Sequence, residues 1–168
     1  DSAVLNSIIG NHTGMRCQFL YMPSEMGAMA DGGGILTGLA WRHMGPESGL
    51  TTDPTPPGGL FYDQHLTIRL GHASSTVASS EKLGISFPGN YASGETPVVV
   101  CNQPSYTVPG GVAASTDTVP FPITPNFKWD GTSPIIVDIT MSAAPTPPPS
   151  DGIRMRCRVF TTGVSPVT

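Results

Sequence analysis

The most strand-like stretch of this chain is Ile135-Ile136-Val137-Asp138-Ile139-Thr140-Met141. Its branched side chains favour extended backbone, because they pack well on a pleated surface. A second run, Leu66-Thr67-Ile68-Arg69-Leu70, alternates leucine and isoleucine with threonine and arginine. A third, residues 97–102 (PVVVCN), is a continuous apolar run that is typical of a buried strand. Together these runs predict a protein built from β-strands.

Outward from these runs, the other segments alternate in the same way or are cut by turn residues. Glycine and proline number 20 and 18, which in an all-β chain indicates many turns. Prolines at 120, 122 and 125 restrict residues 119–129 to an edge or broken strand. Further strands are expected at residues 16–22, 35–43, 60–70, 82–87, 105–108, 119–129 and 153–162. The predicted fold class is all-β, a β-sandwich or jelly roll with one short helix, placed at residues 23–29.

The 168 residues fit one domain, which we expect to span residues 15–168. Residues 1–14 form an N-terminal arm with four apolar side chains, Val4, Leu5, Ile8 and Ile9. Their spacing suits a strand that assembles with a neighbouring molecule, and it also suits one amphipathic helical turn. Residues 71–80 are expected to form a polar loop. Residues 45–59 are expected to form a second loop, long enough for an interaction role.

Charge excludes one large class of function. Charged residues make up 12% of the chain, about half of the usual share of roughly 25%. The formal net charge is −4, and Lys82 and Lys128 are the two lysines. A nucleic-acid interface needs a cationic face that neutralises phosphates, so nucleic acid is not expected as a partner. No apolar run reaches the roughly 18 residues of a membrane span, so membrane insertion is not expected either.

The three cysteines match no zinc motif, because none of them belongs to a CxxC pair. Cys17 lies in Met15-Arg16-Cys17-Gln18-Phe19, and Cys157 lies in a similar context near the other end of the domain. Terminal strands of β-sandwiches are often neighbours, so we expect a Cys17–Cys157 disulfide that leaves Cys101 over. The alternative is three buried free thiols.

No constellation of catalytic residues is recognisable, and the chain is not expected to be an enzyme. The four histidines fit neither HxH nor HExxH spacing, and no serine lies in a GxSxG context. Asp130 and Asp138 are the one pair of carboxylates to weigh as a glycosidase pair. Asp130 belongs to a turn and Asp138 to an apolar strand, so structural roles are favoured.

No cofactor is expected, although Ca²⁺ is the ion that the loop carboxylates favour. Without a DxDxDG pattern, no metal ligand is assigned. The loop aspartates are Asp31, Asp53, Asp63, Asp117 and Asp151.

A sugar site would need exposed aromatic platforms, since these rings stack on the apolar faces of pyranoses. Five aromatic residues are candidates for this role: Trp41, Tyr62, Tyr91, Tyr106 and Trp129. Both tryptophans lie in or at the end of an expected strand with apolar neighbours. Packing in or around the core is therefore the competing interpretation for them.

Several segments in a fixed order resemble a known module. They are Arg16-Cys17-Gln18-Phe19-Leu20-Tyr21 leading into Ser24-Glu25-Met26, then Ile35-Leu36-Thr37-Gly38-Leu39-Ala40-Trp41, then Leu66-Thr67-Ile68-Arg69-Leu70-Gly71-His72, and last Phe127-Lys128-Trp129-Asp130-Gly131-Thr132-Ser133-Pro134-Ile135-Ile136-Val137-Asp138. This order is similar to a β-sandwich module of secreted and cell-surface bacterial proteins, which often carries a C-terminal sorting or anchoring signal. The resemblance implies a sandwich fold and an extracellular location, and it implies no reaction. This chain differs in its apolar residues 1–10 and in having no such signal within its 168 residues.

Two functions follow from these observations. The first is a structural subunit of an extracellular filament, sheath or surface layer that assembles with copies of itself through strand edges and the arm. Low charge favours such assembly because it weakens mutual repulsion. The alternative is an extracellular carbohydrate-binding or adhesive module with glycans as partners. It would use the exposed aromatics and the loop at residues 45–59.

Overall fold

The computed structural model describes residues 5–9, 15–26, 32–42, 60–62, 65–108, 118–141 and 155–157. Within these ranges the side chains of residues 5–9, 15, 41–42, 60–62, 107–108, 118–120, 122 and 155–157 are outside the description.

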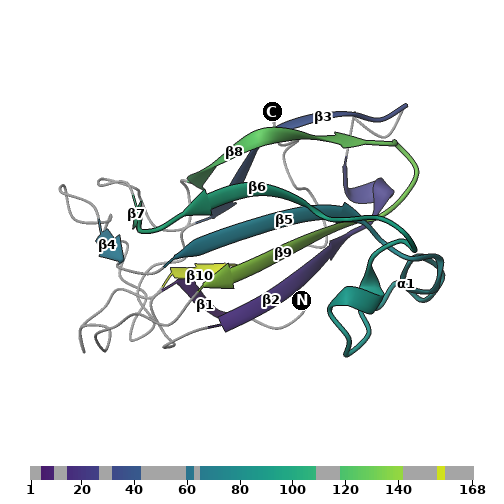
Figure 1. The fold of residues 1–168 in the computed structure, drawn as a ribbon, viewed down its shortest axis with the longest axis horizontal. Helices are drawn as coiled ribbons and strands as arrows, with labels where there is room; N and C mark the ends of the chain where they lie inside the picture. Colours follow the sequence, from purple (N-terminus) through teal and green to yellow (C-terminus); the bar gives the residue numbers. More distant parts are fainter. Residues whose placement is uncertain are drawn as a thin grey trace.

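A four-stranded antiparallel sheet forms the centre of the described structure (Figure 1). Its strand order is β2 (Met15–Tyr21), β9 (Ile135–Met141), β5 (Leu66–His72) and β6 (Val98–Gln103). The stretch that best predicted a strand therefore lies inside the sheet, as β9, with a partner on each side. The residues of β9 are almost all buried, because hydrophobic clusters cover its side chains on both faces of the sheet.

Three two-stranded antiparallel ladders accompany this sheet. They are β1 (Leu5–Ile9) with β10 (Met155–Cys157), β3 (Gly34–Arg42) with β8 (Thr118–Trp129), and β4 (Leu60–Tyr62) with β7 (Tyr106–Val108). Strand β8 carries three prolines and pairs only with β3 among the described residues, as expected for an edge strand. All-β architecture is thereby confirmed.

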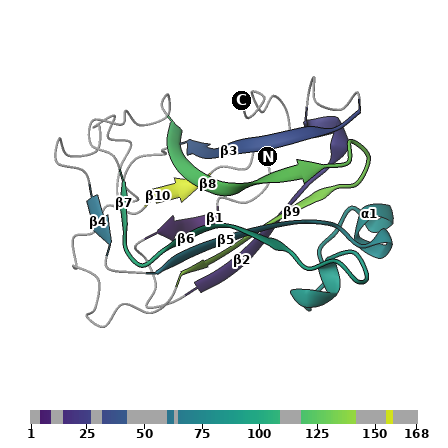
Figure 2. The same cartoon turned by 45° about the horizontal axis from the view of Figure 1, so that its top comes forward.

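The main hydrophobic core lies between the four-stranded sheet and the β3–β8 ladder, which lies above the sheet in Figure 2. Alternate residues of β5 supply Leu66, Ile68 and Leu70, all with no exposed surface. Phe127 and Trp129 from β8 pack against them in the same cluster. Burial of each large apolar side chain contributes about 1.5–3 kcal/mol, so this contact is the main source of stability.

A smaller core lies on the opposite face of the sheet, beneath the segment between β5 and β6. The helix α1 (Ser75–Ser80) and the 3-10 turn η3 (Pro88–Asn90) belong to this segment (Figure 1). Its buried residues are Ala73, Val77, Tyr91 and Ile136. The segment therefore covers part of a sheet face that would otherwise expose Ile136.

Four local predictions differ from the structure in part or in full. Residues 71–80 are not a loop, because β5 continues to His72 and the Ser74 side chain then caps the first turn of α1 by accepting from the Val77 N–H. Residues 82–87 form no strand, and residues 60–70 form two strands in different ladders. In the region of the predicted helix, the structure has a single 3-10 turn, η1 (Pro23–Glu25), and residues 27–31 are outside the description.

Candidate functional site

Asp138 is the one charged side chain that the described structure buries completely, with no exposed surface. It lies in the middle of β9, whose neighbours Val137 and Ile139 point into the main core. Since side chains alternate along a strand, Asp138 points to the opposite face together with Ile136. There it lies beneath the segment that connects β5 to β6.

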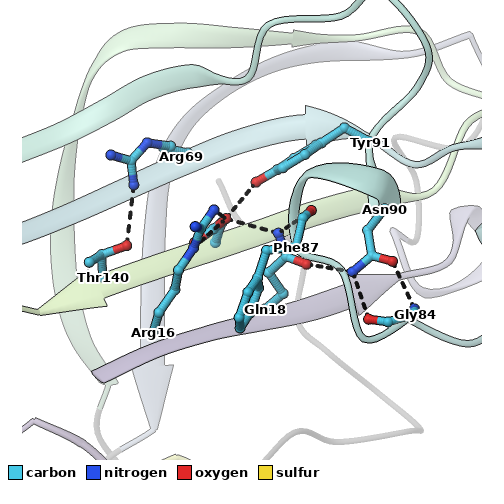
Figure 3. A network of polar contacts seen from close by, with 9 residues as sticks. Arg16, Gln18, Arg69, Gly84, Phe87, Asn90, Tyr91 and Thr140 are labelled. Carbon is cyan, nitrogen blue, oxygen red and sulfur yellow. Dashed lines mark hydrogen bonds and ion pairs between the residues drawn. The ribbon is translucent and has the colours of Figure 1, made fainter. Parts of the chain in front are cut away.

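Three side chains donate hydrogen bonds to the Asp138 carboxylate (Figure 3). Arg16 reaches both oxygens, with Nε at 3.0 Å from Oδ1 and a terminal nitrogen at 2.6 Å from Oδ2. The Gln18 amide nitrogen lies 2.8 Å and the Tyr91 hydroxyl 3.0 Å from Oδ2. Strands β2 and β9 run in register, so Arg16 and Gln18 are presented to the carboxylate from one face of β2.

These contacts keep Asp138 ionised. Burial by itself would raise the pKa of the carboxyl group, but the hydrogen bonds from Arg16, Gln18 and Tyr91 outweigh it and lower the pKa. Burial and the neighbouring Asp138 charge raise the pKa of Tyr91, so its hydroxyl remains a donor. The carboxylate has no proton to donate, and its oxygens are occupied by fixed donors. Arg16 and Asp138 therefore form a structural ion pair.

Asn90 extends this network into the covering segment (Figure 3). Its buried side chain donates to Oε1 of Gln18 at 2.7 Å and to the carbonyl of Gly84 at 3.1 Å, and it accepts from the N–H of Gly84 at 2.7 Å. Gln18 also donates to the carbonyl of Phe87, and the Arg16 guanidinium lies 4.6 Å from the centre of the Phe87 ring. Residues 84–90 are therefore tied to β2 at several points.

A second polar cluster surrounds His72, at the end of β5. Both carboxylate oxygens of Glu95 lie 3.1 Å from Nδ1 of His72, and the backbone N–H of His72 donates to Glu95. Nε2 of His72 is buried without a hydrogen-bond partner and lies 4.0 Å from Asp130. The imidazole also packs against Phe127. His72 thus links β5, the chain before β6 and the turn between β8 and β9.

Asp130 has the turn role that the sequence predicts for it. Its Oδ1 accepts from the backbone N–H groups of Thr132 and Ser133, and its Oδ2 accepts from the Ser133 hydroxyl. Burial opposes ionisation, but these hydrogen bonds dominate and lower the pKa of Asp130 to about 2. Both carboxylates of the candidate glycosidase pair therefore have structural partners.

Three of the five aromatic candidates for sugar stacking are buried. Trp129 is 1% exposed and donates from Nε1 to the Ser133 carbonyl, and Tyr106 is 3% exposed and stacked on Phe121. Tyr91 is 7% exposed and bound to Asp138. None of these three can act as an exposed platform. Trp41 and Tyr62 lie in β3 and β4, but their side chains are outside the described residues.

The structure does not contain the expected Cys17–Cys157 disulfide, because Cys17 has a free thiol. Cys101 has a free thiol as well. Cys17 lies in β2 and packs against the main core, and burial raises the pKa of its thiol to about 12. The strand that contains Cys157 belongs to a different ladder, where Cys157 pairs with Leu5.

The residues of the predicted assembly arm divide in two. Leu5, Ile8 and Ile9 lie in β1, while Val4 lies outside the described residues.

The five loop aspartates considered for Ca²⁺ also lie outside the described residues. Across the described ranges, no group of three or more His, Cys, Asp or Glu side chains is arranged to hold a metal ion. No helix there is long and apolar enough to cross a membrane.

The network around Asp138 was not predicted, although one signal for it is visible in the sequence. A single carboxylate interrupts an otherwise apolar strand, and it requires a buried donor. Arg16 and Gln18 occupy alternate positions of another strand and could have been proposed as that donor. Tyr91 and Asn90 lie in a segment without periodicity, so nothing local places them near Asp138.

Comparison with known protein families, curated proteins and solved structures finds no match to this chain. The geometry of the described residues is therefore the basis on which a function is assigned.

Proposed function

We propose that this protein is a structural subunit of an extracellular filament, sheath or surface layer, assembling with copies of itself. The observation that carries the proposal is the β1–β10 ladder. Strand β1 contains three of the four apolar residues of the predicted arm, Leu5, Ile8 and Ile9, and its strand partner is the three-residue β10. Two residue pairs define the ladder, Leu5 with Cys157 and Ile9 with Met155, with a register shift between them.

A strand held by so short a ladder is well suited to exchange between molecules. Residues 5–9 of one copy would replace the same residues in the next, with identical contacts and little net cost. If each copy donates to one neighbour and receives from another, the contact does not close and the assembly grows. The low charge of the chain, 12% of its residues, opposes this growth only weakly.

The way in which the sheet and the ladders pack into layers is part of the same proposal. We propose that the four-stranded sheet and the ladders facing it form a β-sandwich of the jelly-roll kind. Strand β10 contacts β3, and β8 contacts β6, which supports a second layer built from the β1–β10 and β3–β8 ladders. The segments that resemble the secreted bacterial module agree with this arrangement and with an extracellular location.

The carbohydrate-binding function is the weaker candidate. Tyr91, Tyr106 and Trp129 are buried, so the function would rest on Trp41 and Tyr62. No observation on the described residues favours it.

Negative-stain electron microscopy of the purified chain and of a variant without residues 1–10 tests the structural function. We expect filaments, tubes or sheets from the full chain and none from the deletion variant. A synthetic peptide of residues 1–14 should bind the deletion variant, because it restores β1. A peptide with Leu5, Ile8 and Ile9 changed to serine is the matched control and should not bind.

Two outcomes would count against the proposal. Unchanged assembly of the deletion variant would show that β1 exchange is not the mechanism. A full chain that forms no extended assembly at any concentration would reject the structural function, and screening against glycans would then be the next step.

A further inference from the structure

The face of the four-stranded sheet that lies opposite the main core has two different halves. The half around Ile136 is apolar and is covered by the segment that contains α1 and η3. The half around Thr140 is polar, because strand alternation and register bring polar side chains of the neighbouring strands to its side, namely Arg16, Thr67 and Asn102. The side chain of Arg16 is 37% exposed and Asn102 is exposed, so solvent reaches this half.

Arg69 of β5 belongs to the polar half and has no acidic partner among the described residues. Its register partner is Asp138, but three fixed donors already occupy the oxygens of that carboxylate. The Arg69 guanidinium donates instead to the Thr140 hydroxyl at 3.2 Å, the only hydrogen bond that the described contacts give its side chain (Figure 3). Arg69 is partly buried, so most of its N–H groups are held near the sheet without a protein acceptor.

Thr140 lies between two arginines that come from opposite sides. Arg16 is its register partner on β2, and Arg69 binds its hydroxyl from β5. The Arg16 guanidinium uses Nε and one terminal nitrogen for Asp138, and the described contacts give its second terminal nitrogen no partner. Figure 3 shows both arginines on the same face of the sheet, on either side of β9. Unused donors of both residues are therefore available around Thr140.

The charges of the polar half do not cancel. Two guanidinium groups, those of Arg16 and Arg69, accompany the single carboxylate of Asp138, whose pKa is lowered by its hydrogen bonds so that it stays ionised. The described residues thus leave an excess of positive charge here, although the whole chain has a formal net charge of −4. A partly buried charge is screened less than an exposed one, so this excess attracts an anion.

We infer that the polar half of this face is a binding site for an oxyanion, a carboxylate or sulfate group, held beside Thr140 by Arg69 and Arg16. The planar fork of a guanidinium matches two oxygens of such a group, and Arg69 has the unused donors to bind it in this way. The second terminal nitrogen of Arg16 supplies a further donor. The Thr140 hydroxyl accepts from Arg69 and can donate its own hydrogen to the anion.

The site goes beyond the proposed function, and neither depends on the other. Assembly through β1 uses residues 5–9, whereas the anion site uses β2, β5 and β9 of the central sheet. The oxyanion has two possible sources, a free anion in solution or a carboxylate of a second copy of the chain.

NMR of the full chain labelled with ¹⁵N-arginine tests the site, in solution or with magic-angle spinning if the chain has assembled. The probe is sodium sulfate, which replaces sodium chloride at constant ionic strength. We expect a saturable shift of the Arg69 Nε–H signal, and a smaller shift of the Arg16 signal because its Nε stays on Asp138. Arg69→Gln identifies the Arg69 signal by removing it.

Substitutions then compare affinities through the Arg16 signal. Arg69→Gln should weaken sulfate binding about tenfold or more, because the charged fork is lost. Arg69→Lys keeps the charge without the fork and should have an intermediate affinity. Lys128→Gln is the matched control, since it removes one positive charge from an exposed residue of β8, and it should leave the affinity unchanged.

Dilution in chloride alone distinguishes the two sources of the anion. An Arg69 signal that depends on protein concentration, and that sulfate competes for, would identify a carboxylate of a second copy. A signal that responds to sulfate alone would identify a free anion, and both results support the site.

Two results would overturn the inference. One is an Arg69 signal without a saturable response to sulfate, and the other is an equal loss of affinity in Arg69→Gln and Lys128→Gln, which would show general screening. Either result would leave the proposed function standing if the chain still forms filaments. Loss of filaments from the full chain would not affect the anion site.

Discussion

At the scale of single residues, the main feature is an ionised carboxylate held inside the protein by fixed donors. An isolated charge at this position would be strongly destabilising, and Asp138 is tolerated because Arg16, Gln18 and Tyr91 replace the water it has lost. Arg16 remains 37% exposed, so part of the ion pair is still screened by solvent.

Asp138→Asn should lower the free energy of unfolding by about 1–3 kcal/mol, because the amide no longer balances the Arg16 charge and turns a donor toward other donors. Chemical denaturation at neutral pH measures this change. Tyr91→Phe removes a single hydrogen bond to the same carboxylate and should cost about 1 kcal/mol or less. Equal effects of the two substitutions would contradict the importance we give to the ion pair.

At the scale of elements, the turn after β8 crosses closely over the chain that leads into β3. Gly131 and Gly33 both have positive φ, +84° and +80°, which glycine adopts without strain. A Cβ atom on Gly131 would lie 2.7 Å from the carbonyl carbon of Gly32 and still closer to the backbone nitrogen of Gly33. Both glycines are therefore required for the two chain segments to approach.

Gly131→Ala should destabilise the fold by about 2–4 kcal/mol, through left-handed strain and the clash with the neighbouring backbone. Gly94→Ala is the matched control, since Gly94 has φ +79° but nothing within 4 Å of its Cβ position. That substitution should cost about 1–2 kcal/mol from strain alone. Thermal unfolding of both variants compares them directly, and equal losses would show that the close approach is unimportant.

At the scale of the whole molecule, stability depends on carboxylates in two different places. Asp130 and Asp138 both have a pKa below the ordinary value of 3.8, and that of Asp130 is about 2. A lowered pKa in the folded state gives stability that is complete above the unfolded pKa and lost as the pH falls through the folded pKa. The fold should therefore weaken as the pH falls from about 4 toward 2.

Urea denaturation between pH 5 and 2 measures this dependence. The double variant Asp130→Asn/Asp138→Asn should show a flatter profile over the lower part of that range, because two of the linked protons are removed. An unchanged slope would show that these two carboxylates do not dominate the acid response.

The sequence predicted the strands that are rich in branched residues and failed where local signals were weak. Strands β5, β6 and β9 were predicted because apolar alternation and β-branched runs are local properties. The helix at Ser75–Ser80 was missed because its sequence, STVASS, is mostly serine and threonine, which are typical of loops. The Asp138 network joins residues 122 positions apart, and no local pattern in one sequence encodes such a pairing.

The position of Asp138 also has a consequence for how the chain avoids misfolding. Without the carboxylate, residues 135–141 would be an unbroken run of apolar and β-branched side chains, the composition that forms cross-β aggregates. A slip of one residue in the pairing of β9 would turn Asp138 into the main core, away from Arg16, Gln18 and Tyr91. Asp138 thus makes wrong registers and intermolecular stacking of this strand costly before the native partners have assembled.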